Sequence, residues 1–162
     1  MAKVTLTIDR GPIGATGATG PQGDRGFGII SKEGLASTGD YDEGAEIWKD
    51  EDQAITSGIV YYLNNLGQLS VPSNSSILLG GARKLFLSLS TQASDGLLSR
   101  GFVYLSSDPG GNIGDPVYLG TSGAITSTAP TASGSIVRVL GYKFDTNIIY
   151  FDPSKEWTEI GV

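Results

Sequence analysis

A glycine stands at every third position from residue 11 to residue 26, and this repeat constrains the fold more than any other feature of the chain. Pro12 and Pro21 each follow one of these glycines, at a position where a polyproline II backbone is favoured. Only glycine fits where three polyproline II chains meet at a common axis, so the repeat predicts a collagen-like triple helix. The glycines that would mediate trimerisation are Gly11, Gly14, Gly17, Gly20, Gly23 and Gly26.

A flexible linker is the alternative interpretation of residues 11–28. Such linkers are typically rich in Gly and Ser and have no strict period. This segment contains no Ser and carries two Pro, which favours the triple helix. Five triplets are too few to hold three chains together unaided. A neighbouring domain must therefore contribute, and we expect a homotrimer.

Residues 1–10 form a separate arm. Within Lys3–Asp9, apolar and polar residues alternate with the period of a half-buried strand. One short strand is not stable alone, so it must pair with copies of itself or with another protein. We therefore expect this strand to be a site of attachment to another protein. Its candidate residues are Val4, Leu6, Ile8 and Arg10.

Residues 29–162 predict an all-β domain, with a β-sandwich or jelly-roll-like arrangement. Short apolar runs are separated by turn residues at strand-like spacing, and helical periodicity is limited to one turn near Asp50–Ile55. The expected strands are Ala45–Lys49, Gly58–Leu63, Gln68–Val71, Lys84–Ser90, Gly101–Ser106, Pro116–Leu119, Ala124–Thr128, Ile136–Lys143, Asn147–Phe151 and Trp157–Gly161.

The composition argues against an enzyme. The chain has neither Cys nor His, which excludes disulfides, Cys/His zinc sites, thiol nucleophiles and His-based triads. No pair of carboxylates has a catalytic signature, and we expect no cofactor and no metal. An oxygen-ligand set for calcium is conceivable in one loop, but a Gly-rich hairpin turn is the favoured interpretation. Those loop residues are Asp108, Asn112 and Asp115.

The net charge of −6 is concentrated in residues 29–60. No basic face is evident, which disfavours nucleic-acid binding. The acidic stretch Glu33–Asp52 could bind a cation or a basic partner, although a solvated surface is the more ordinary role. No run approaches the roughly 20 apolar residues of a membrane span, and the opening residues lack the apolar core of a signal peptide.

The combination of a short collagen repeat and a compact β domain resembles the capsid decoration and head-fibre proteins of tailed bacteriophages. The C-terminal segments are also similar to modules of phage virion proteins; they are residues 114–126, 137–142, 149–154 and 157–160. The resemblance implies a structural homotrimer on the capsid surface of the virion, assembled in the host cytoplasm. Its N-terminal part would bind the major capsid protein. A fibre tip that binds a host receptor or surface glycan is the alternative.

Overall fold

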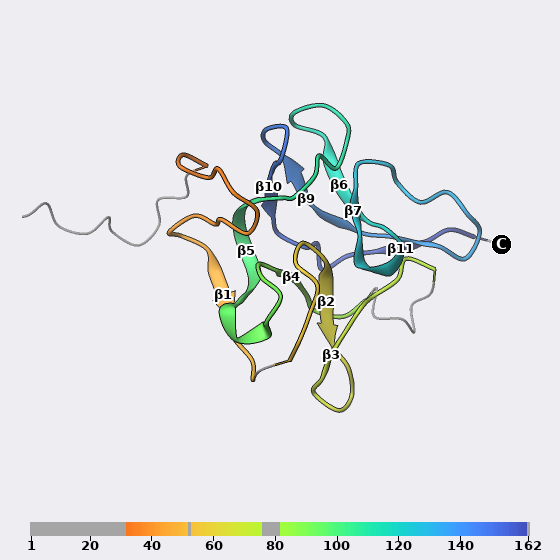
Figure 1. Cartoon of the computed structure of the whole chain (residues 1–162). Helices are drawn as coiled ribbons and strands as arrows, with labels where there is room; N and C mark the ends of the chain where they lie inside the picture. The colour runs from red at the N-terminus through yellow and green to blue at the C-terminus, as the bar shows by residue number, and fades with distance from the viewer. Residues whose placement is uncertain (1–31, 52, 76–81, 162) are drawn as a thin grey trace, which may run out of the picture.

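A computed structural model describes residues 32–51, 53–75 and 82–161 of the chain (Figure 1). The predicted arm, residues 1–10, and the predicted stem, residues 11–28, lie outside these ranges. Their assigned roles in attachment and trimerisation therefore stay predictions.

The described residues form short strands and two 3-10 turns, η2 (Ala93–Asp95) and η3 (Thr121–Gly123), without an α-helix. Within these ranges there is accordingly no helix long and apolar enough to cross a membrane. The strands are β1 (Glu46–Trp48), β2 (Val60–Leu63), β3 (Leu69–Ser70), β4 (Leu85–Ser88), β5 (Leu97–Tyr104), β6 (Pro116–Leu119), β7 (Ile125–Thr126), β8 (Ile136–Val137), β9 (Val139–Lys143), β10 (Ile148–Phe151) and β11 (Thr158–Glu159).

Nine strands form one antiparallel sheet, in the order β3-β2-β4-β5-β10-β9-β6-β7 with β1 added beside β5. The other two, β8 and β11, make a two-stranded ribbon. The prediction of an all-β domain is confirmed: the sheet is antiparallel and curled. The finer expectation of a sandwich or jelly roll stays a prediction.

Strand β5 is shared by the two halves of the sheet. Residues 39–48, which include β1, follow one of its edges. The other edge is divided, because β4 pairs with Leu97 and Leu98 whereas β10 pairs with residues 101–104. The two halves diverge from this edge, and the sheet curls around the space between them (Figure 1).

The main hydrophobic core fills that space. Both halves contribute to it, since alternate residues of a strand face the same side. In β10, for example, Ile149 and Phe151 are fully buried while Tyr150 faces the opposite side. The buried core residues are Val60, Leu85, Leu87, Leu89, Leu98, Val103, Leu105, Val117, Leu119, Leu140, Ile149 and Phe151. Leu85, Leu87 and Leu89, at alternate positions, thus all contribute to this core.

A second, smaller cluster covers the other face of β2 and β4. Phe86 lies between the core leucines of β4 in sequence but points into this cluster, where its ring is 5.2 Å from that of Trp48. Every residue of β4 is consequently buried. The cluster comprises Ile55, Tyr61, Leu69, Phe86, Ala93 and Leu97.

All ten predicted strand regions contain a strand, but the structure differs from the prediction in four details. Strand β5 begins at Leu97 rather than Gly101, and the predicted strand 136–143 is divided at Arg138 into β8 and β9. The expected helical turn at residues 50–55 is absent from the described part of that segment. Trp157 precedes β11 instead of lying in it and is 36% exposed.

The side chain of Asp42 takes the place of a backbone carbonyl as a hydrogen-bond acceptor for β5, at the point where residues 39–48 follow that strand. Its amide N–H donates to the Phe102 carbonyl (3.3 Å), and its Oδ1 accepts the Phe102 N–H (2.8 Å). The carboxylate occupies space that a side chain at Gly101 would need, because a Cβ there would lie 2.7 Å from Oδ1. The expectation of a solvated acidic stretch is wrong for Asp42, which is 5% exposed.

We expect Asp42→Ala to lower the free energy of unfolding by about 1–3 kcal/mol, because the buried Phe102 N–H would lose its acceptor. Asp42→Asn keeps an acceptor oxygen and should cost less. Urea denaturation at one fixed protein concentration measures both. Glu43→Ala, at the exposed neighbouring position, is the control. An effect of Asp42→Ala no larger than that of the control would contradict this role.

Candidate functional site

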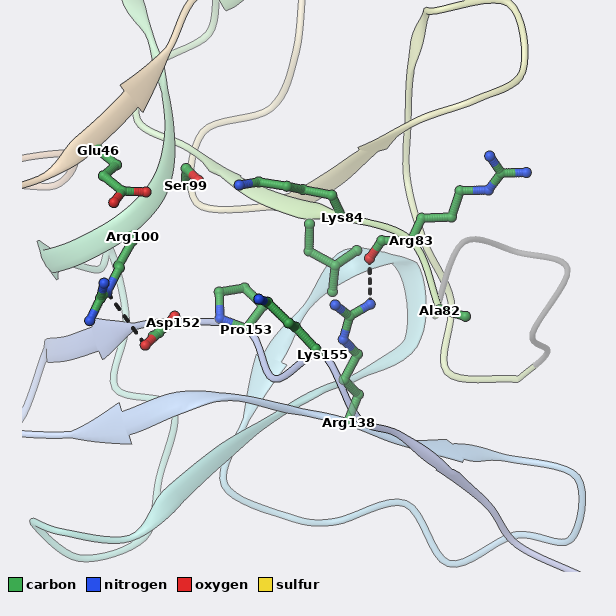
Figure 2. A pocket seen from close by; sticks show the side chains of 11 residues that line it. Glu46, Ala82, Arg83, Lys84, Ser99, Arg100, Arg138, Asp152, Pro153 and Lys155 are labelled. Carbon is green, nitrogen blue, oxygen red and sulfur yellow. Dashed lines mark hydrogen bonds and ion pairs between the residues drawn. The ribbon is translucent and has the colours of Figure 1, made fainter.

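A groove of about 520 Å³ opens where β4 and the segment after β10 diverge from β5 (Figure 2). Ser99 and Arg100 lie at this point, between the residues of β5 that pair with β4 and those that pair with β10. The volume suits a small ligand. The groove is lined by Glu46, Ala82, Arg83, Lys84, Leu85, Ser99, Arg100, Arg138, Asp152, Pro153 and Lys155.

Arg138 ties the walls of the groove together. It separates β8 from β9, and its guanidinium donates to the carbonyl of Ser154 (Nε, 2.9 Å) and to the carbonyl of Arg83 (Figure 2). The residue is only 4% exposed, and burial lowers the pKa of its guanidinium to about 10. Arg138 therefore remains charged at neutral pH.

Arg100 forms a polar network at one end of the groove. Its Nε donates to the Tyr150 hydroxyl (3.0 Å) and lies 3.5 Å from a carboxylate oxygen of Asp152. The hydrogen bond to Tyr150 and the neighbouring carboxylate raise the pKa of this guanidinium. Both partners of the ion pair are about half exposed, so the pair is open to competition from a ligand.

Lys84 and Lys155 approach the middle of the groove from two different segments (Figure 2). Lys84 extends toward Ser99, and its ammonium lies 5.8 Å from the centre of the Phe86 ring. Within the described residues, neither lysine has an ion-pair partner. Arg83 differs, because its guanidinium points away and donates to Asn65 (2.7 Å).

Positive charge is concentrated in this groove of an otherwise acidic chain. Five of the eight Lys and Arg residues that the structure describes line it, against two of the fourteen described Asp and Glu residues. Arg83 turns away, Arg100 is paired with Asp152 at one end and Arg138 is buried against two carbonyls, so Lys84 and Lys155 present their charge most directly to the groove. Such a site attracts anions.

An aromatic face covers the outer side of β5, β9 and β10, opposite the main core. It consists of Phe102, Tyr142, Phe144 and Tyr150. Phe102 pairs with Tyr150 across β5 and β10, and Tyr150 pairs with Tyr142 across β10 and β9. The Phe102 ring lies 4.9 Å from that of Phe144 and 5.0 Å from that of Tyr150, both edge to face. Tyr142 is 50% exposed and Phe144 is 40% exposed.

The first described residue of the chain contacts one end of this aromatic face. The Lys32 ammonium donates to the Phe144 carbonyl (3.3 Å) and to an Asp145 carboxylate oxygen (3.0 Å). This contact lowers the pKa of the Asp145 carboxyl. It fixes the point where the N-terminal part of the chain joins the domain, next to the turn between β9 and β10.

The loop that contains Asp108, Asn112 and Asp115 is held by hydrogen bonds from the ammonium group of Lys143. Lys143 is 5% exposed, and its Nζ donates to Asp108 Oδ1 (2.7 Å) and to the carbonyls of Gly110 and Gly111 (3.2 and 3.0 Å). Asp115 instead accepts from Asn112 within the same loop. Across the residues with described positions, no three acidic side chains gather as a metal site. The interpretation as a Gly-rich turn is favoured.

The predicted site residues all precede residue 29 and lie outside the described ranges, so their roles stay predictions. The groove was not predicted from the sequence, because its cationic side chains are far apart in the chain. The alternation in β9 and β10 was the available signal for the aromatic face. No known protein-family model matches this chain, and no curated protein matches it.

The ion pair of Asp108 with Lys143 predicts a defined response to acid. The hydrogen bond from Lys143 lowers the pKa of Asp108 below its ordinary 3.8. A depressed pKa stabilises the folded chain above the unfolded-state pKa, and this contribution is lost as the pH falls through the folded-state value. Asp108→Asn should therefore be less stable than wild type at neutral pH, and the difference should shrink below about pH 3.8.

Urea denaturation of both proteins at neutral pH and at about pH 3 measures this difference. In a Lys143→Met background the pH-dependent effect of Asp108→Asn should be smaller, because only the hydrogen bond from the Gly110 N–H then remains to lower the pKa of Asp108. A stability difference that stays constant with pH would show that the charge of Asp108 does not matter.

Proposed function

We propose that this protein is a trimeric decoration or head-fibre protein of a tailed-bacteriophage capsid. The glycine repeat of residues 11–28 carries the proposal, because its spacing suits three identical chains at one axis. In this hypothesis residues 29–162 form the projecting domain, arranged as a sandwich or jelly roll. The role is structural, without catalysis.

The geometry of the domain is compatible with attachment at the N-terminal side. The described chain starts on one side of the domain, whereas its C-terminal end lies on the opposite side (Figure 1). An arm and stem before residue 32 could therefore hold the domain away from the capsid. Three arms on one trimer would bind equivalent capsid subunits together, and the avidity would turn weak contacts into stable attachment.

The proposal predicts a homotrimer of about 51 kDa, three times the 16.9 kDa of one chain. Gly17→Val should disrupt the triple helix, because its side chain would enter the crowded axis, and should leave the β domain folded. Ala18→Val is the matched control, since an X position faces outward. Sedimentation equilibrium and circular dichroism measure these effects. A monomeric wild-type protein would refute the trimer, and equal behaviour of the two variants would favour the linker.

Removal of residues 1–10 tests attachment separately. We expect the shortened protein to remain trimeric and to lose binding to purified empty capsids, measured by cosedimentation. A monomeric product would make the arm a trimerisation device. Undiminished capsid binding would place the docking surface elsewhere.

A fibre tip that binds a host ligand is the second candidate function, and the groove at β5 specifically favours it. Lys84 and Lys155, which form no ion pair with any described residue, line the groove together with a buried arginine, so the groove suits a carboxylate- or phosphate-bearing surface glycan better than a neutral one. A charge-assisted hydrogen bond contributes about 1.5–3 kcal/mol, and a tenfold change in affinity corresponds to about 1.4 kcal/mol.

Titration calorimetry with tri-galacturonate, compared with the neutral galactose trisaccharide, tests this binding. We expect the acidic sugar to bind more tightly and Lys84→Glu/Lys155→Glu to weaken it by about tenfold or more. Lys49→Glu changes an exposed lysine outside the groove and should have little effect. Equal affinity for the acidic and neutral sugars, or equal losses in the two variants, would contradict an anion site.

A further inference from the structure

We infer that the aromatic face, formed by Phe102, Tyr142, Phe144 and Tyr150, is the contact between the β domains of three copies of this chain. The inference rests on the proposed trimer and adds to it the surface through which the domains associate. The occupant of the face on each copy is therefore a second copy of the same chain.

The composition and exposure of the aromatic face are those of a contact surface. Aromatic side chains are enriched where proteins associate, and clustered exposed aromatics are unusual on a surface that stays in water. Tyr142 and Phe144 are 50% and 40% exposed, although the Phe144 ring packs against the buried Phe102 and Tyr142 lies beside Tyr150. Other exposed apolar residues, such as Leu66 in the turn after β2, belong to no comparable aromatic cluster among the described residues.

Charged and polar side chains border the aromatic face at both ends. Lys32 and Asp145 form an ion pair at one end. At the other end Arg100 contacts the Tyr150 hydroxyl and Asp152. An apolar centre bordered by exposed charged pairs is the ordinary anatomy of a protein interface.

The tether between the glycine repeat and the domain is short. Lys32 follows Gly26, the last glycine in register, by six residues. Six extended residues reach about 20 Å at most. If residues 11–26 of three chains share an axis, each Lys32 must lie within about that distance of it.

This tether restricts which side of the domain can face the axis. A compact domain of this size has a radius of gyration of about 14 Å and hence a diameter of about 35 Å. If the opposite side faced the axis, Lys32 would lie farther from it than the tether allows. Because Lys32 contacts Phe144 and Asp145, the aromatic face is the surface brought toward the axis.

Single cysteines provide a direct test, because the natural chain contains none. In the full chain, we expect Tyr142→Cys to form covalent dimers with a short bis-maleimide cross-linker, as one cysteine per chain allows. Leu66→Cys, 81% exposed in the wild type, should stay uncross-linked. Tyr142→Ser should weaken trimer association by roughly tenfold or more in sedimentation equilibrium, whereas Leu66→Ser should not.

The possible outcomes separate this inference from the proposed function. A wild-type protein that is monomeric would refute the trimer and with it the contact. A wild-type trimer in which Tyr142→Cys fails to cross-link and Tyr142→Ser associates normally would overturn the contact alone. Circular dichroism of each variant confirms that the domain is folded, so that a loss of association is not a loss of structure.

Discussion

The structure depends on one strand whose edge is divided between two partners. Along one edge of β5, the first residues pair with β4 and the last residues pair with β10. The sheet must therefore separate into two halves, and the apolar faces of both halves enclose one core. The same separation leaves Ser99 and Arg100 at a fork, where the groove lies. Core and groove are thus two results of one pairing pattern.

On the opposite edge of β5, close packing against residues 39–48 requires a glycine at position 101. Gly101 has a positive φ of 140° and no room for a side chain, because Asp42 and Ala45 lie against it. A buried carboxylate completes the backbone hydrogen bonds of Phe102 at that position. A polar residue in an acidic stretch consequently serves the fold rather than solvation, which composition alone could not distinguish.

Sequence periodicity was a good guide to where strands occur and a poor guide to their limits. Leu97 and Leu98 are both buried because the two faces of β5 contact different clusters, so the start of this strand has no alternation to detect. The predicted strand 136–143 is divided because β8 pairs with β11 and a bulge interrupts the pairing of β9 with β6. Such limits depend on partners distant in the chain. The groove was hidden for the same reason, since β4, β5 and the segments around β9 and β10 all contribute to it.

The two layers of the groove differ in how freely they can change. Arg138 holds backbone carbonyls from two segments and is buried, so its replacement would disturb the scaffold. Lys84 and Lys155 lie above it and make no ion pair among the described residues. Exposed positions of this kind tolerate substitution at little cost to stability. Substitutions at Lys84 and Lys155 can therefore change which ligand the groove binds during evolution, while Arg138 and the fold that it supports stay the same.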